Sequence, residues 1–151
     1  MTRQPDKPRV LFLCTGNSCR SQMAEAFLRH EAGDRFTACS AGLDPQPVNP
    51  LTLQVLAEAG LSIDGLRSKS TNEFLGRVAI HYAIFVCDKA QQACPRIYPF
   101  ALQSLYWPFE DPAAAQGTPA ERLAKFRAVR EQIHHQIKHW LATLAQPHSA
   151  R

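Results

Sequence analysis

Residues 14–21 read Cys-Thr-Gly-Asn-Ser-Cys-Arg-Ser, a segment whose residue types suit the binding of a tetrahedral oxyanion. Gly16 and its small neighbours allow the backbone to curl so that successive N–H groups point inward, and Arg20 adds a planar guanidinium that can bind two oxygens. Cys14, at the start of this cluster of positive groups, should be a nucleophilic thiolate at neutral pH. The expected anion-binding residues are Thr15, Gly16, Asn17, Ser18, Cys19, Arg20 and Ser21.

Single residues of this loop have expected roles of their own. Asn17 tolerates left-handed backbone geometry and can hydrogen-bond across the loop. Ser21 can donate a hydrogen bond to the thiolate, whereas Cys19 has no evident role and is interpreted as packing. The competing explanation is a strand–turn–helix junction with incidental cysteines. We disfavour it because each residue type stands where the chemistry needs it.

Three further residues have side chains that could take part in catalysis. Cys87 and Cys94 are close in sequence, and Pro95 follows the second. Such a pair can exchange disulfides. The alternatives are a buried cysteine at a strand end, a loop thiol without function, and a zinc site, for which a second Cys/His pair is missing. Asp111 precedes Pro112 in the sequence. In this position Asp111 could be a catalytic carboxyl or an ordinary turn residue.

The predicted elements bring these residues to one edge of a sheet. Apolar runs and β-rich segments predict strands at 9–14, 36–40, 80–87 and 102–107. Strands that alternate with helices imply a parallel sheet, and sites in such folds lie at the carboxyl ends of the strands. Cys14 and Cys87 each close a predicted strand, and Asp111 lies just past another. All three should therefore share that edge.

The helices have recognisable start and stop signals. Asn49 and Pro50 suit an N-cap followed by the first helical position, and Gly60 suits the end of that helix. Capping boxes begin at Ser70, for a short helix, and at Thr118, for a long one. The expected apolar face of the long helix comprises Leu123, Phe126, Val129, Ile133, Ile137, Trp140 and Leu144.

Two segments and three histidines are predicted to be peripheral. Residues 88–101 are rich in Pro and polar groups and predict a loop, and the tail from residue 146 should fray. His134, His135 and His139 lie on the polar side or edges of the long helix, which suggests a solvated face.

Composition limits the class of protein. The chain has 151 residues, a net charge of +4 and 45% hydrophobic residues, which predicts one globular domain over 1–151 with a core at about 8–145. The sequence contains no run of basic residues with interleaved aromatics, the pattern that would indicate nucleic-acid binding. No apolar stretch is long enough for a signal peptide or a membrane span. We expect a cytoplasmic monomer without metal or cofactor, whose five cysteines start out reduced.

The Cys14-x5-Arg20-Ser21 pattern, with Gly16 and Asn17, resembles the signature loop of the low-molecular-weight tyrosine phosphatases. Those phosphatases usually have Pro after the Ser, whereas residues 22–25 here read Gln-Met-Ala-Glu, which is similar to the arsenate reductases that share the phosphatase fold. The similarity continues through residues 40–42, 49–50 and 107–112 and both later cysteines. It implies an α/β fold of three layers, with a four-stranded parallel sheet of order 2-1-3-4 flanked by helices.

The resemblance also implies a three-cysteine relay that reduces arsenate to arsenite, with phosphate and sulfate as analogues. Cys14 attacks arsenate, Cys87 attacks the sulfur of Cys14, and Cys94 moves the disulfide to Cys87–Cys94. Asp111 protonates the leaving oxygen. Thioredoxin is the expected reductant, and glutaredoxin or another thiol carrier stays open. Two alternatives remain, namely a phosphatase that uses a Cys14 phosphoenzyme and an oxyanion or arsenic sensor without turnover.

Some members of the family bind potassium beside the loop through an Asn, a Glu, a Ser and an Asp. Asn17, Glu25 and Ser40 match three of these positions, and Lys69 falls at the fourth. A lysine ammonium could take the place of the ion. We therefore expect no potassium requirement.

Overall fold

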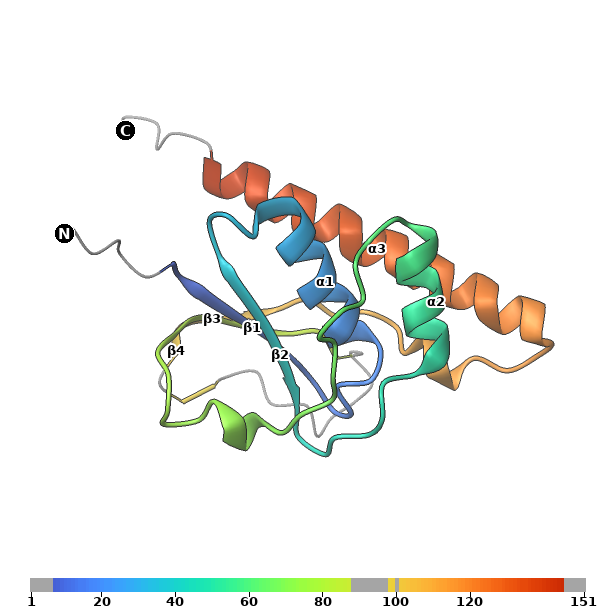
Figure 1. Cartoon of the computed structure of the whole chain (residues 1–151), viewed down its shortest axis with the longest axis horizontal. Helices are drawn as coiled ribbons and strands as arrows, with labels where there is room; N and C mark the ends of the chain where they lie inside the picture. Colours follow the sequence, from blue (N-terminus) through green and yellow to red (C-terminus); the bar gives the residue numbers. More distant parts are fainter. Residues whose placement is uncertain (1–6, 88–97, 100, 146–151) are drawn as a thin grey trace.

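The computed structural model describes residues 7–87, 98–99 and 101–145. At its centre is a parallel sheet of order β2-β1-β3-β4, which confirms the predicted topology (Figure 1). The strands are β1 (Arg9–Cys14), β2 (Thr37–Gly42), β3 (Ile80–Phe85) and β4 (Ala101–Tyr106). Residues 10–14 of β1 are all buried because β1 pairs on both sides and is covered on both faces, as its unbroken apolar run predicted.

Three α-helices and two short 3-10 turns complete the described elements. They are α1 (Arg20–Ala32), α2 (Pro50–Glu58), α3 (Pro119–Ala145), η1 (Thr71–Glu73) and η2 (Pro112–Ala114). The predicted caps form. The Asn49 side chain accepts from the N–H of Leu51, and Thr118 and Glu121 exchange a reciprocal pair of hydrogen bonds. The capping signal at Ser70 opens only the single turn η1.

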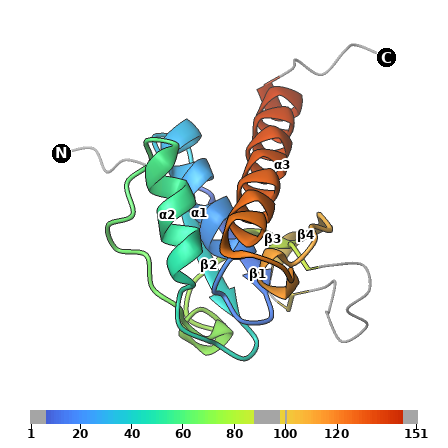
Figure 2. The ribbon, with the colours of Figure 1, turned by 90° about the vertical axis from the view of Figure 1, so that its right-hand side faces the viewer.

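Helices α1 and α3 pack together over one face of the sheet, and α2 packs against both of them (Figures 1 and 2). An aromatic cluster joins α3 to the sheet on this face. The Trp140 ring lies 5.1 Å from that of Tyr82 and 5.7 Å from that of Trp107, and Trp107 lies 6.0 Å from Phe12. Edge-to-face contacts of this kind add to the burial of large rings.

The opposite face of the sheet has a different cover. Leu13 and Phe85 line an apolar pocket there. Successive side chains of a strand lie on opposite faces of the sheet, so Phe12 and Ile84 face the helices instead. The pocket is completed by Leu43, Thr71, Leu75, Tyr98 and Pro99. In the described part of the chain, the third layer therefore consists of η1 with its flanking loop and of Tyr98.

Several element boundaries differ from the predictions. The strand predicted at 80–87 ends at Phe85, and the strand predicted at 102–107 begins at Ala101, so the predicted loop over 88–101 is wrong at its last residue. Residues 88–97, with Cys94, and the tail from residue 146 lie outside the described residues.

Two predictions about α3 are wrong. Leu144 is 41% exposed because it lies one turn beyond Trp140, which already packs on Phe36 just before the start of β2. His134 is not on a solvated face. Its ring stacks on that of Phe27 with centroids 4.3 Å apart, and its Nε2 lies 3.1 Å from a Glu31 carboxylate oxygen. The packing of α1 on α3 creates this environment. The other two histidines of the group, His135 and His139, are exposed as predicted.

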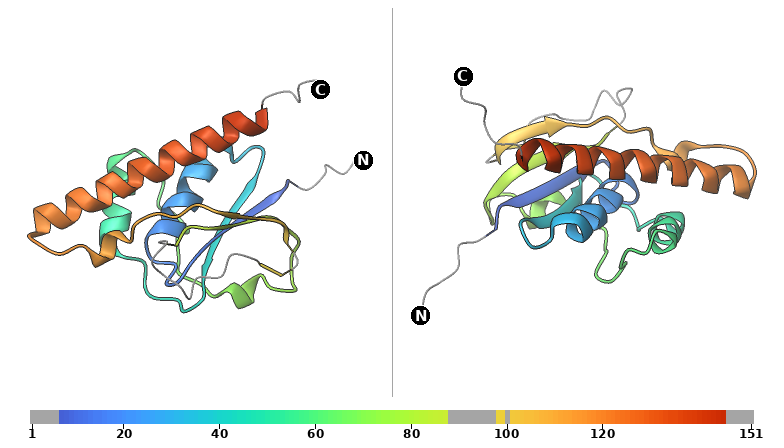
Figure 3. Two further views of the ribbon diagram at one scale, coloured as in Figure 1. Left: turned by 180° about the vertical axis from the view of Figure 1, so that it is seen from behind. Right: turned by 90° about the horizontal axis from the view of Figure 1, so that it is seen from above.

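Helix α3 is the longest element and extends past the sheet at its N-terminal end (Figure 3). Over the described ranges, no helix combines the length and the hydrophobicity that crossing a bilayer requires.

Candidate active site

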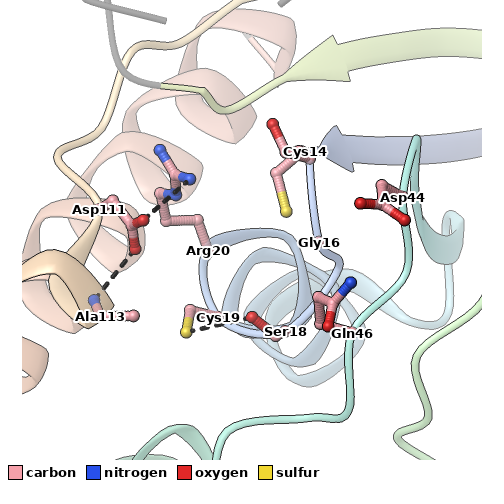
Figure 4. A pocket seen from close by; sticks show the side chains of 10 residues that line it. Cys14, Gly16, Ser18, Cys19, Arg20, Asp44, Gln46, Asp111 and Ala113 are labelled. Carbon is pink, nitrogen blue, oxygen red and sulfur yellow. Dashed lines mark hydrogen bonds and ion pairs between the residues drawn. The ribbon is translucent and has the colours of Figure 1, made fainter.

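A pocket of about 240 Å³ opens at the carboxyl ends of the strands, the edge at which the sequence predicted a site (Figure 4). Its lining comes from the anion loop, from the segment after β2 and from the segment before η2. The lining residues are Cys14, Thr15, Gly16, Ser18, Cys19, Arg20, Asp44, Gln46, Asp111 and Ala113.

Cys14 is the last residue of β1, and its sulfur is held by hydrogen bonds. The Ser21 hydroxyl oxygen lies 2.9 Å from Sγ, and the Asn17 backbone N–H donates to Sγ over 3.3 Å. Asn17 Nδ2 donates to the same Ser21 oxygen at 2.8 Å. Since that oxygen already accepts a hydrogen bond from Asn17, its own O–H can be directed at the sulfur. The arrangement suits a thiolate acceptor, the role expected of Ser21.

Asn17 has a φ of 52°, the left-handed conformation that its residue type tolerates. Gly16 does not have a positive φ, so the turn of the loop depends on Asn17 and not on the glycine. The Asn17 amide is fixed from both ends, since its Oδ1 accepts from the backbone N–H of Lys69 at 2.9 Å while Nδ2 donates to Ser21. A chain of hydrogen bonds thus runs from Lys69 to the Cys14 sulfur.

Residues 42–49, which we call the strap, run alongside the anion loop and bind its carbonyl groups. Four strap N–H groups donate to four loop carbonyls: Leu43 to Cys14 (3.3 Å), Asp44 to Thr15 (2.8 Å), Gln46 to Gly16 (2.8 Å) and Asn49 to Ser18 (3.1 Å). With the loop carbonyls turned outward and satisfied, the loop N–H groups can face the pocket. The strap therefore fixes the conformation of the loop.

Gln22 completes this outer set of bonds. Its Nε2 donates to the Asn17 carbonyl at 2.9 Å and to the Arg67 carbonyl at 2.8 Å. The sequence pointed to Gln22 only as a mark of resemblance. Its structural role could not be read from the sequence, because Arg67 lies far away along the chain.

Arg20 begins α1, and its side chain is 5% exposed. Its Nη1 donates to the Phe109 carbonyl at 3.1 Å, and its Nη2 lies 3.9 Å from Asp111 Oδ2. No side chain caps the helix at its N-cap residue, Cys19, so the positive end of α1 is open to the pocket. Guanidinium and helix end together favour an anion.

Asp111 is a turn residue that also lines the pocket. Its Oδ1 caps η2 by accepting from the N–H of Ala113 at 3.0 Å, while its residue lines the pocket beside Arg20. Glu110, the neighbouring carboxylate, is bound to Lys125 at 2.7 Å and is absent from the pocket lining. Of these two neighbouring carboxylates, Asp111 is therefore the one that lies in the pocket.

The cysteines beside Cys14 differ in their surroundings. Burial raises the pKa of the Cys19 thiol, whose sulfur lies 3.5 Å from the Ser18 hydroxyl oxygen. Cys87 is fully buried, follows β3 by two residues and is in a disulfide. The N–H of Val86 bonds the carbonyl of Leu13, so Cys87 lies next to the end of β1.

Lys69 meets Glu25 and Ser40 in a buried cluster behind the loop. The Lys69 ammonium lies 3.6 Å from the Glu25 carboxylate and 3.4 Å from the Ser40 hydroxyl, which itself donates to Glu25 at 2.6 Å. Burial lowers the pKa of Lys69, and the Glu25 carboxylate counteracts the shift. The ammonium thus lies among the residues that matched a cation site.

Comparison with known proteins gives a consistent result. Residues 9–150 match the family model described as low molecular weight phosphotyrosine protein phosphatase. A protein of Bacillus licheniformis named arsenate reductase is 38% identical over 140 residues, which cover 91% of this chain and 97% of that protein.

Two solved structures share the fold. One is described as an arsenate reductase in the phosphate binding state. It has a TM-score of 0.69 and 26% identity, and the match covers 91% of this chain and 99% of that one. The other is a thioredoxin-dependent arsenate reductase of Corynebacterium glutamicum, with a TM-score of 0.64, 27% identity, and coverage of 93% of this chain and 64% of that one. With its parallel sheet and the loop from Cys14 to Ser21, the chain belongs to the low-molecular-weight phosphotyrosine protein phosphatase family.

Proposed function

We propose that this protein is an enzyme that reduces arsenate to arsenite, with Cys14 as nucleophile and Cys87 and Cys94 as resolving thiols. The observation that favours this over simple hydrolysis is a second cysteine, Cys87, beside the strand that carries Cys14. Cys87 is in a disulfide next to the end of the strand that carries Cys14, which is itself a free thiol. Hydrolysis needs one cysteine, whereas reduction needs two electrons from thiols.

The first step is attack of the Cys14 thiolate on arsenic, which forms an S–As bond and expels one oxygen as water. Arg20, the inward N–H groups of residues 15–21 and the end of α1 bind the remaining oxygens. Asp111 supplies the proton to the leaving oxygen. Ser21 and Asn17 hold the thiolate before attack.

The second step transfers electrons. The Cys87 thiolate attacks the Cys14 sulfur, the S–As bond breaks, and its electron pair stays on arsenic, which leaves as arsenite after protonation. Cys94 then attacks Cys87 and frees Cys14. A free Cys14 with a disulfide-bonded Cys87 matches this stage, in which the enzyme awaits an external dithiol.

The external reductant in this proposal is a thioredoxin, because a thioredoxin-dependent arsenate reductase shares the fold over 93% of this chain. Glutaredoxin or another thiol carrier is the alternative donor. We further propose that residues 1–151 form one domain that acts as a cytoplasmic monomer.

The test is Cys87→Ser, assayed both for arsenate-dependent NADPH oxidation with thioredoxin and thioredoxin reductase and for hydrolysis of an aryl phosphate. Arsenate turnover should be lost, while hydrolysis, which needs only Cys14, Arg20 and Asp111, should persist. Cys39→Ser is a matched control, because Cys39 is a free thiol outside the pocket lining. Loss of neither activity in Cys87→Ser would reject the redox relay.

A phosphatase that works through a Cys14 phosphoenzyme is the second candidate, favoured by the family match and by an anion loop that suits phosphate equally well. It predicts that wild-type protein hydrolyses aryl phosphates and leaves arsenate unchanged in the coupled assay.

The electron donor of the reductase is identified by a comparison within the same coupled assay. Arsenate turnover is measured once with thioredoxin and thioredoxin reductase and once with glutathione and glutaredoxin.

A further inference from the structure

The pocket contains a second carboxylate, that of Asp44, which none of the steps above uses. Asp44 comes from the strap, and its backbone N–H binds the Thr15 carbonyl at 2.8 Å. Gln46, two residues later, is held in the same way on Gly16 and lines the same wall. Figure 4 shows Asp44 on the side of Cys14 that faces away from Asp111. The ladder of strap bonds thus fixes a carboxylate at the mouth of an anion site.

The two carboxylates of the pocket have different partners. Asp111 accepts from the N–H of Ala113 and lies 3.9 Å from the Arg20 guanidinium. Within residues 7–87, 98–99 and 101–145, no group donates a hydrogen bond to the Asp44 carboxylate and no cation pairs with it. Its oxygens are therefore available to a molecule in the pocket.

A carboxylate only accepts hydrogen bonds, so it favours an oxyanion that carries a hydroxyl group. Arsenate and phosphate keep one hydroxyl at neutral pH, whereas sulfate has none. A phosphomonoester, whose second pKa is about 6, has also lost its last hydroxyl proton at neutral pH. Facing these ligands, a carboxylate repels all of them by charge but offers a hydrogen bond only to the first two.

We propose that Asp44 is a specificity-determining residue that selects free, hydroxyl-bearing tetrahedral oxyanions by accepting a hydrogen bond from the hydroxyl. This inference rests on the proposed function and deepens it, since it names the substrate class that the pocket prefers. Arg20 and the loop N–H groups bind the bare oxygens, and Asp44 binds the protonated one. Inorganic sulfate and phosphomonoesters are disfavoured because they place an unprotonated oxygen, itself a hydrogen-bond acceptor, beside the Asp44 carboxylate.

The test compares phosphate and sulfate binding to the full-length protein by titration calorimetry at neutral pH, for wild type and Asp44→Asn. The amide keeps the shape of the side chain and can donate to a bare oxygen. The wild type should prefer phosphate, and the variant should lose about tenfold of this preference, the effect of one hydrogen bond to a charged group. Asp34→Asn, an exposed aspartate in the turn between α1 and β2, is the matched control and should leave the ratio unchanged.

Two results would overturn the proposal. One is an unchanged ratio of the phosphate and sulfate affinities in Asp44→Asn, which would mean that the carboxylate acts through its charge alone or not at all. The other is a wild type that does not bind phosphate in preference to sulfate. Binding is measured without turnover, so these results are distinct from a failure of the proposed function. That failure would appear as phosphate selectivity without arsenate reduction.

Discussion

Cys14 and Cys19 share one loop but have opposite surroundings. The Cys14 sulfur accepts a hydrogen bond from the Asn17 N–H and lies 2.9 Å from the Ser21 hydroxyl, two groups that can stabilise a thiolate. Cys19 is buried against the Ser18 hydroxyl, and burial disfavours its charged form. Both side chains line the pocket, so their reactivity should differ through electrostatics and not through access.

At neutral pH, iodoacetamide should therefore modify Cys14 well before Cys19 in the reduced protein. Because the pKa of Cys19 is raised above its ordinary value of 9.0, its thiol stays protonated through neutral pH, and its modification should increase only in more alkaline solution. Peptide mapping by mass spectrometry measures both rates. Cys39, whose pKa burial also raises, is an internal reference outside the pocket. Equal modification of the two loop cysteines at neutral pH would contradict this account.

At the scale of elements, the junction of β2 and the strap determines the shape of the anion loop. Gly42 ends β2, and a Cβ added there would lie 2.8 Å from the Thr15 carbonyl oxygen and 2.9 Å from the Asn17 backbone N. Both contacts are with the loop backbone, which cannot move without losing the strap bonds. Gly42 is required because no side chain fits between β2 and the loop, whereas Asn17 is required for its positive φ.

Gly42→Ala should lower the free energy of unfolding by about 1–3 kcal/mol, the usual cost of overpacking, and should weaken phosphate binding as well. Denaturant unfolding and titration calorimetry measure the two effects. Gly16→Ala is the matched comparison, since a Cβ there would meet side-chain atoms at ordinary contact distances, Gln46 at 3.5 Å and the Ser18 hydroxyl at 3.6 Å, and no positive φ is involved. A stability loss in Gly16→Ala as large as that in Gly42→Ala would argue against the strap as the shaping element.

The segment after α2 supplies the ammonium that lies behind the loop. Since Lys69 contacts Glu25 and Ser40, turnover of the wild type should be the same in potassium as in sodium salts. Lys69→Ala removes the ammonium and leaves the Glu25 carboxylate, so turnover should fall and potassium should restore part of it. Lys138→Ala, at an exposed position of α3, is the control. Several-fold activation of the wild type by potassium over sodium would exclude this role of Lys69.

At the scale of the whole molecule, the aromatic cluster around Trp140 joins the far end of α3 to the starts of β2 and β3 and to Trp107 after β4. The chain from Trp107 leads directly to Asp111. The cluster therefore fixes the position of α3 on the sheet and the course of the segment that carries the candidate acid.

Trp140→Ala should lower the free energy of unfolding by about 3–5 kcal/mol, because it leaves a large cavity in a buried cluster. Trp140→Phe keeps an aromatic ring against Tyr82 and should cost less than half of this. Thermal or denaturant unfolding of the reduced protein gives both values. If Trp140→Ala were nearly neutral, the cluster would not be what holds α3 in place.

The amino-acid sequence alone predicted the four strands, the parallel sheet, the helix caps and the loop that begins at Cys14. These predictions depend on local signals, namely apolar runs, capping residues and turn-forming residues, which act within a few positions of the chain. The same local logic indicated that Asn17 tolerates the left-handed conformation that it adopts. It failed at His134 and Leu144, because their exposure depends on where a neighbouring helix or the edge of the sheet lies.

Only the tertiary structure decided which distant groups surround the loop. The bonds from the strap to the loop carbonyls, the bridge from Gln22 to Arg67 and the position of Asp44 in the pocket all join segments that the chain brings together after a strand or a helix. The register of β1 against β2 sets these contacts, and no local pattern encodes a register between strands. The sequence could therefore identify the nucleophile, while the walls of its pocket became visible only when the sheet was assembled.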